Sequence, residues 1–262
     1  SIPDTTPHYS REQAIPPIVF QTAESRMVHP THAKSISEFR EKNQDLAFRF
    51  FDAHQRDEYM ETRWTDTLIL DVYRRSVFGQ MKADIFRYCI VFEKGGYYFD
   101  FNKGCTEPLT SFHGPEATGL VSYESNPELI FPNIEVAHQL SNPFNLVLQW
   151  AFGFAPQHRF LELVIDRIVE IEPFFRARVF PNPKEALLTM SAPGVFTDVF
   201  RRYVAAFGIG TIVEAGEDFF GAGVFRLRGS KFLQNKADYY GHLANKSIVR
   251  DKNGGFPSHS ES

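Results

Sequence analysis

The order of apolar segments in the chain predicts an α/β protein with a mainly parallel sheet flanked by helices. Two apolar strands, residues 15–22 and 46–51, are each followed by a segment with helical periodicity, residues 31–43 and 56–62. Strands that alternate with helices in this way form βαβ units. The chain has 262 residues, 43% of them hydrophobic, and no linker rich in proline, glycine or serine. We therefore expect a single domain over residues 15–250, preceded by a polar arm at 1–14 and followed by a flexible tail at 251–262.

The remaining elements follow from the same two periodicities. Apolar residues three or four apart indicate helices, and short apolar or aromatic runs bounded by glycine or proline indicate strands. A proline near the start of an amphipathic run marks the beginning of the last expected helix. In chain order we expect helices at 67–77 and 80–94, strands at 97–101 and 119–123, a short apolar segment at 130–137, helices at 158–171 and 193–206, and an edge strand at 221–227.

The helix expected at 80–94 and the strand after it carry the most informative pattern. The helix is apolar over most of its circumference and ends at two glycines, so it should be buried. Asp84 and Arg87 lie three residues apart and therefore share one side of it. A buried charge is costly unless it is paired or used in function. These two residues, together with Asp100 at the end of the next strand, indicate either a buried ion pair or a functional site.

A second argument concerns the ends of the predicted strands. In open α/β sheets, ligands bind outside the carboxyl ends of the strands. Thr22, Asp52 and Asp100 each stand at such an end. This rule favours the three residues as facing a site, although each residue type is also common in a turn that follows a strand.

Composition excludes some classes of function. The net charge is −4 and the sequence pI is about 6.1, which argues against nucleic acid as a partner. No run of 18 apolar residues predicts a membrane span. Cys89 and Cys105 allow one disulfide at most, and Cys89 on a buried helix reads as a small core residue, so the cytosol is the simpler compartment. The chain begins with Ser, which leaves room for an upstream anchor.

The segment KADIFRY, followed after six residues by GGYYFDFN, resembles the DxD sugar transferases of glycosyltransferase family 32. The Pro-Leu pair at 108–109 also fits that pattern. One position departs from it, because Asn102 stands where the family has the second Asp of its DxD motif. Weaker matches lie at 15–22 and 242–248, where Phe20 and Ile248 replace the usual His and Trp. The matching positions in the main segment are Lys82, Ala83, Asp84, Arg87, Tyr88, Gly95, Gly96, Tyr98 and Asp100.

This resemblance implies a GT-A fold, with a Rossmann-like sheet, and a divalent cation, Mn²⁺ or Mg²⁺, on the diphosphate of a nucleotide sugar. It places Asp100, Asn102 and His242 at the cation. Asn102 offers a neutral amide oxygen, so the metal charge is less well compensated than by two acids. Asp100, Asp84 and Arg87 are the implied catalytic residues, and a strand-end turn residue or a structural ion pair is the alternative for each. The implied donor-binding residues are Gln21, Thr22, Asp84, Arg87, Gly96, Tyr98 and Ser247.

The resemblance implies a retaining hexosyltransferase that uses GDP-mannose or a UDP-hexose. Its acceptor would be a saccharide or glycolipid, with peripheral membrane association and no nucleic acid. The compartment would be the cytoplasm of a bacterial-type system, or the Golgi lumen if an anchor precedes the chain. A nucleotidyltransferase is a poorer reading, because no glycine-rich loop follows Thr22. The other alternative is a protein that binds a sugar nucleotide or glycan through a degraded DxD site, which Asn102, Phe20 and Ile248 favour.

Overall fold

The computed structural model describes residues 1–9, 12–127, 132–230 and 244–251. Within them, seven strands form one sheet in the order β2-β1-β3-β7-β5-β6, with β9 also paired to β5. These strands are β1 (Ile18–Thr22), β2 (Ala47–Phe51), β3 (Gly96–Phe99), β5 (Gly119–Pro127), β6 (Asn145–Val147), β7 (Ala151–Phe154) and β9 (Ile212–Glu217). The helices are α1 (Pro30–Glu41), α2 (Ala53–Arg63), α3 (Leu68–Arg75), α4 (Gly79–Lys94), α5 (Ile134–Ala137), α6 (Arg159–Phe175), α7 (Pro183–Met190) and α8 (Pro193–Phe207), with a 3₁₀ turn at Leu109–Ser111.

The predicted α/β class, with helices flanking a sheet, is confirmed. β1 runs parallel to both β2 and β3, and β5 runs parallel to β9. β7 lies between β3 and β5 and is antiparallel to both, as β6 is to β5. Three residues, 148–150, join β6 to β7, and both strands run along β5 in the same direction. The sequence pattern did not predict β6, β7, β9 or α7.

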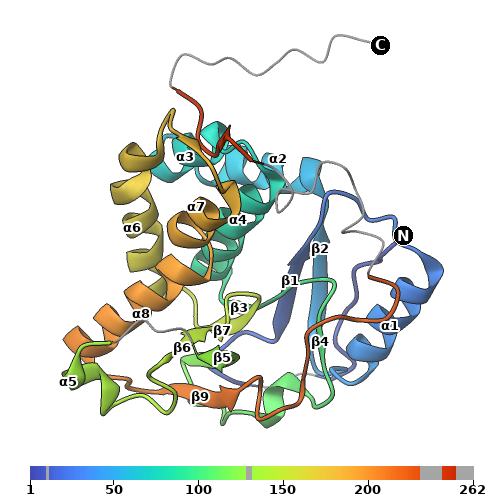
Figure 1. Ribbon diagram of the computed structural model, residues 1–262. Coiled ribbons are helices and arrows are strands. Elements are labelled where there is room, and N and C mark those ends of the chain that lie inside the picture. The colour runs from blue at the N-terminus through green and yellow to red at the C-terminus, as the bar shows by residue number, and fades with distance from the viewer. Residues whose placement is uncertain (10–11, 128–131, 231–243, 252–262) are drawn as a thin grey trace.

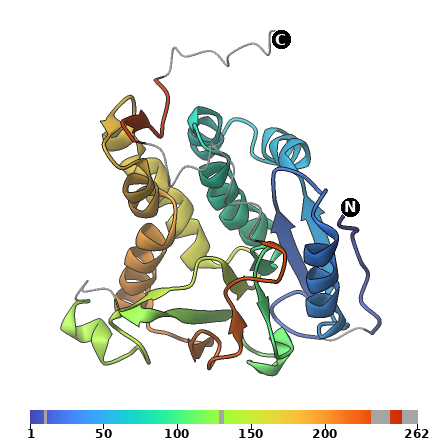
Figure 2. The ribbon, with the colours of Figure 1, turned by 45° about the vertical axis from the view of Figure 1, so that its right-hand side comes forward.

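Helices cover the two faces of the sheet unequally (Figures 1 and 2). α4, α6, α7 and α8 gather on one face, and α1 lies on the other. Successive side chains of a strand point to opposite faces, and β3 follows this rule. Tyr98 packs into the larger cluster beneath α4, whereas Tyr97 and Phe99 join the cluster on the α1 face.

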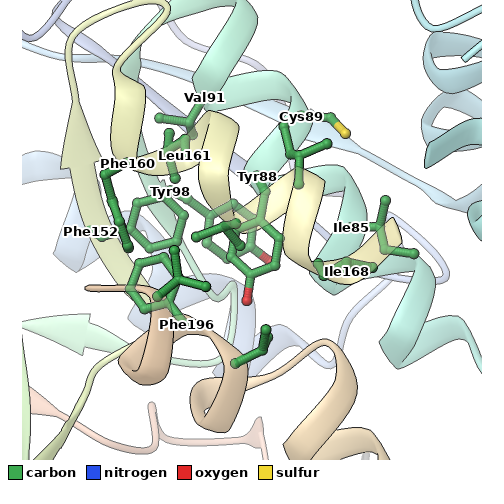
Figure 3. Close-up of a cluster of buried hydrophobic side chains, with 14 of the residues drawn as sticks. Ile85, Tyr88, Cys89, Val91, Tyr98, Phe152, Phe160, Leu161, Ile168 and Phe196 are labelled. Carbon is green, nitrogen blue, oxygen red and sulfur yellow. The ribbon is translucent and has the colours of Figure 1, made fainter. Parts of the chain in front are cut away.

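α4 is the central helix of the larger cluster, as its apolar pattern predicted. Nearly all of its side chains from Met81 to Val91 are buried. The ring of Tyr88 is stacked with those of Phe152 and Phe196, at centroid distances of 6.3 and 5.5 Å (Figure 3). The helix ends at Gly95, which has φ of +65°. This burial fixes the direction of α4 and thereby sets the positions of the two charged residues on its side.

Two short ladders and the N-terminal arm complete the described structure. β4 (Gly104–Cys105) pairs with β10 (Gly223–Val224), and β8 (Val179–Phe180) pairs with β11 (Lys246–Ser247). The arm packs along β2, where Ile2 is buried and Thr5 bridges to Phe48. Both cysteines are buried free thiols. In the described ranges, no helix combines the length and the apolar character needed to cross a lipid bilayer.

Candidate functional site

Three charged residues predicted from the sequence meet where β3 ends. Asp84 and Arg87 come from α4, and Asp100 follows the last residue of β3. Arg87 Nη2 lies 3.0 Å from Asp84 Oδ1 and 3.4 Å from Asp100 Oδ1. Asp84 and Arg87 are buried, whereas the Asp100 side chain is 26% exposed. Asp100 is therefore the most exposed member of this charged cluster.

Two polar residues that the sequence reasoning did not single out hold the buried end of the cluster. Gln149 Nε2 donates to Asp84 Oδ1 at 2.8 Å, and Ser191 Oγ donates to Asp84 Oδ2 at 2.9 Å. Gln149 also accepts from Arg87 Nη1 through its side-chain oxygen at 2.9 Å and its carbonyl at 3.0 Å. Both residues lie far from Asp84 along the chain, so no local signal marked them.

Burial and neighbouring charges act in opposite directions on this pair. Burial raises the pKa of Asp84 to about 6, although Arg87, Gln149 and Ser191 favour its ionised form. Burial lowers the pKa of Arg87, but the combined effect of Tyr98, Asp100 and Asp84 outweighs it and holds that pKa above its ordinary value. Arg87 is thus a permanent cation beside a carboxylate that is costly to ionise.

Tyr98 supports the charged cluster from inside the fold. Its hydroxyl donates to Asp100 Oδ1 at 3.0 Å, and the Arg87 guanidinium lies 4.4 Å from the centre of its ring. The side chain is 1% exposed. Tyr98 therefore lies in the core beneath the site and supports Asp100 from there.

The residues at the predicted cation position fit a small oxygen site. Lys103 N–H donates to the Asp100 carbonyl at 3.0 Å, which closes a turn that carries Asp100 and Asn102 together. His242 lies outside the described residues. Across the ranges that are described, no three His, Cys, Asp or Glu side chains gather as a metal site. Mg²⁺ often binds through one or two protein oxygens and completes its shell with phosphates and water. One carboxylate and one amide therefore fit a cation shared with a diphosphate.

The residues predicted at the ends of β1 and β2 form hydrogen bonds within the protein. Gln21 accepts from Arg40 at 2.9 Å, and Thr22 donates to the Phe51 carbonyl at 2.7 Å. Both are buried, at 1% and 4% exposure. Asp52 caps α2 in a reciprocal capping box with Gln55, so its position at the end of β2 has a local structural reason.

Gly96 and Ser247 have structural surroundings of their own in the fold. Gly96 begins β3, at the opposite end of that strand from Asp100, and packs against Ile18. Ser247 lies in β11 and donates to the Val249 carbonyl at 2.7 Å. The intervening Ile248 carbonyl accepts from Val77 N–H, which places the Ser247 segment beside the start of α4.

A lysine beside the candidate cation position was missed by the sequence reasoning. Lys103 is 8% exposed, and its Nζ lies 3.4 Å from the ring centre of Phe225 and 5.1 Å from that of Trp150. Its ammonium donates to the Phe225 carbonyl at 3.2 Å. Burial lowers the pKa of Lys103, while Asp100 opposes that effect. A single lysine after the DxD-like motif carries no recognisable sequence signal.

Comparisons with known proteins found the following similarities. A family model described as "Glycosyltransferase sugar-binding region containing DXD motif" matches residues 27–119, which include Asp84, Arg87 and Asp100. The chain is 24% identical over 177 residues to the initiation-specific alpha-1,6-mannosyltransferase of Schizosaccharomyces pombe, covering 64% of this chain and 42% of that protein. The solved structure of the PaToxG glycosyltransferase has a TM-score of 0.49 at 12% identity, covering 72% of this chain and 70% of the other.

Proposed function

On the premise that the chain carries the DXD sugar-binding region of a glycosyltransferase, we propose that it transfers a hexose from a nucleotide sugar to a saccharide acceptor. The predicted resemblance to family 32 is confirmed, and the enzyme class, a glycosyltransferase, belongs to this proposal, because the family model matches residues 27–119 and the chain spans 42% of the mannosyltransferase relative. The observation that carries the proposal is the cluster of Asp84, Arg87 and Asp100, in which one acid is exposed and the other two groups are buried.

The proposed roles follow from this division. Arg87 and Tyr98 both bind Asp100 Oδ1, so they orient the carboxylate while its second oxygen stays available to a ligand. Arg87 presents a planar guanidinium suited to sugar or phosphate oxygens, and Asp84 keeps that guanidinium in place from behind. Asp84 also accepts hydrogen bonds from the donor sugar in this proposal. Gln149 and Ser191 position Asp84.

The cofactor and the donor belong to the same proposal. Asp100 and Asn102, with His242, would hold a divalent cation, Mn²⁺ or Mg²⁺, which would supply Lewis-acid stabilisation of the diphosphate leaving group. We propose a retaining, front-face transfer in which the departing phosphate helps to deprotonate the acceptor. Among the donors, GDP-mannose is favoured by the name of the mannosyltransferase relative, and UDP-hexoses follow. The acceptor is a polysaccharide or glycolipid, with peripheral membrane association.

A second candidate function is favoured by Asn102. A protein with a degraded DxD site would bind a sugar nucleotide or a glycan without transferring the sugar. Asn102 contributes no charge at a position where two acids normally face the metal, and that loss weakens metal-assisted chemistry first. Donor turnover therefore separates the two functions.

Nucleoside diphosphate release tests the proposal. GDP-mannose, UDP-glucose, UDP-galactose and UDP-N-acetylglucosamine are incubated with the protein, with Mn²⁺ or EDTA, and the released diphosphate is measured. The variants are Asp100→Asn and Asp52→Asn, which remove the same charge from two strand ends. We expect turnover of at least one donor, lost in Asp100→Asn and kept in Asp52→Asn, since Asn also caps helices well. Saturable donor binding without release would favour the binding protein.

A further inference from the structure

Lys103 differs from Arg87 and Arg56, two other buried cations near the carboxyl ends of the central strands. Arg87 is paired with Asp84 and Asp100, and Arg56 is paired with Glu24. In the described part of the chain, the ammonium of Lys103 has a hydrogen bond to a backbone carbonyl and no ion pair with a carboxylate. One N–H of three is used in that bond, so two remain.

A cation in such surroundings is expensive. Removing an ammonium from water costs several kcal/mol unless an anion or several acceptors replace the water. The aromatic rings of Trp150 and Phe225 offset a part of this free-energy cost through cation–π interactions with the ammonium. Asp100 and Glu124 attract the Lys103 charge from longer range, and Arg226 and Arg87 repel it. An anionic ligand is the partner that this arrangement lacks.

The sequence around Lys103 indicates which anion fits. A DxD motif with its metal combines two negative charges with two positive charges. In this chain Asn102 removes one negative charge, and Lys103, the next residue, adds one positive charge. Asp100 and Lys103 are joined in one turn by the bond from Lys103 N–H to the Asp100 carbonyl. The pair is neutral without a metal, so the same turn can receive a diphosphate with less dependence on a cation.

We propose that Lys103 binds the diphosphate of the nucleotide-sugar donor and supplies part of the positive charge that the leaving group requires. This inference rests on the proposed glycosyltransferase function. It assigns a role to Lys103, the residue that follows Asn102 at the position of the second acid. Donor binding then survives removal of divalent cations, because the Lys103 charge does not depend on them.

A purely structural role is the competing explanation. The backbone of residues 102–105 is joined to that of 223–227 by the β4–β10 ladder and by the bond from Leu227 N–H to the Asn102 carbonyl. In this explanation, the contacts of Lys103 with the carbonyl and the ring of Phe225 only stabilise the ladder. In that case its removal would loosen the ladder and leave the affinity for a diphosphate unchanged.

Calorimetric titration with GDP and with UDP, each in EDTA and in Mn²⁺, separates these roles. Lys103→Met keeps the length of the side chain and removes its charge, whereas Lys103→Arg keeps the charge. Lys34→Met is the matched control, because the Lys34 side chain is 79% exposed on α1. Circular dichroism establishes that each variant is folded, and Lys103→Gln replaces the methionine variant if that one is not.

We expect Lys103→Met to weaken diphosphate binding in EDTA by about tenfold or more, the loss of one hydrogen bond between charged groups. Lys103→Arg and Lys34→Met should stay within about twofold of wild type. Equal affinities of folded Lys103→Met and wild type overturn the inference, as does an equal loss in Lys103→Arg. If wild type binds neither diphosphate with or without Mn²⁺, the proposed function itself fails, and the inference falls with it.

Discussion

Asp84→Asn should stabilise the fold at neutral pH while it abolishes donor binding. Asp84 is 6% exposed, and its pKa is raised from 3.8 to about 6, first of all by burial. A shift of one unit corresponds to about 1.36 kcal/mol, so ionised Asp84 costs the folded state about 3 kcal/mol. That cost already includes the attraction of Arg87. Replacing Asp84 with a neutral residue removes this free-energy cost from the folded state.

The surroundings of Asp84 can accept an amide in its place. An amide oxygen can accept from Gln149 and Arg87 as Asp84 Oδ1 does, and the amide nitrogen can donate to Ser191, whose hydroxyl also accepts. Imperfect geometry reduces the gain, so we expect Asp84→Asn to be more stable by about 1 to 3 kcal/mol at pH 7.5. Donor binding should be lost because the amide is a weaker acceptor for sugar hydroxyls and leaves Arg87 less firmly held.

The pH dependence gives this prediction its sign. Between about pH 4 and pH 6, the folded state holds a proton on Asp84 that the unfolded state has released. The stability contributed by this group is therefore fully present below pH 4 and is lost as the pH rises through 6. Urea unfolding of wild type and Asp84→Asn at pH 4, 5, 6 and 7.5 should show a difference that grows from near zero to its plateau. A variant less stable than wild type at pH 7.5, or a difference that does not vary with pH, would refute the reasoning.

Four further predictions concern α4, β3 and the turn that follows β3. Arg87→Lys should lose most transfer activity and about 2 to 3 kcal/mol of unfolding free energy, because an ammonium cannot reach both Gln149 oxygens and two carboxylates at once. Near-normal turnover in the folded variant would exclude a contact between Arg87 and the donor. Asp100→Ala should abolish transfer, and Asn102→Asp should raise Mn²⁺ affinity in calorimetry with nucleotide present; unchanged affinity would mean that position 102 does not face the cation. Gly96→Ala should lower the melting temperature far more than Gly208→Ala. Both glycines have positive φ, but a Cβ on Gly96 would lie 2.6 Å from the Ile18 carbonyl oxygen, whereas a Cβ on Gly208 meets nothing within 4 Å. Similar decreases in melting temperature would contradict this explanation.

Local patterns in the sequence determined the elements that carry the charged cluster. The apolar circumference of α4 predicted its burial, and the spacing of Asp84 and Arg87 placed both on one side of it. The aromatic run before Asp100 predicted β3 and its end. These signals are local because each depends on the period of one element, and the structure agrees with them to within a few residues. Gln149 and Ser191, by contrast, contact Asp84 from 65 and 107 residues away. No period within one element encodes such contacts.

Tertiary packing also decided which residues at strand ends face outward. Thr22, Asp52 and Asp100 look alike in the sequence, but Thr22 bonds to the neighbouring strand and Asp52 caps α2. The carboxylate of Asp100 instead lies beside the buried Arg87. The surroundings of Lys103 are likewise set by tertiary packing, which brings the aromatic rings of Trp150 and Phe225 to its ammonium group. The sequence by itself determined the helix, the strand and the motif. Only the packing of distant segments decided which of their polar groups are satisfied within the protein and which remain available to a ligand.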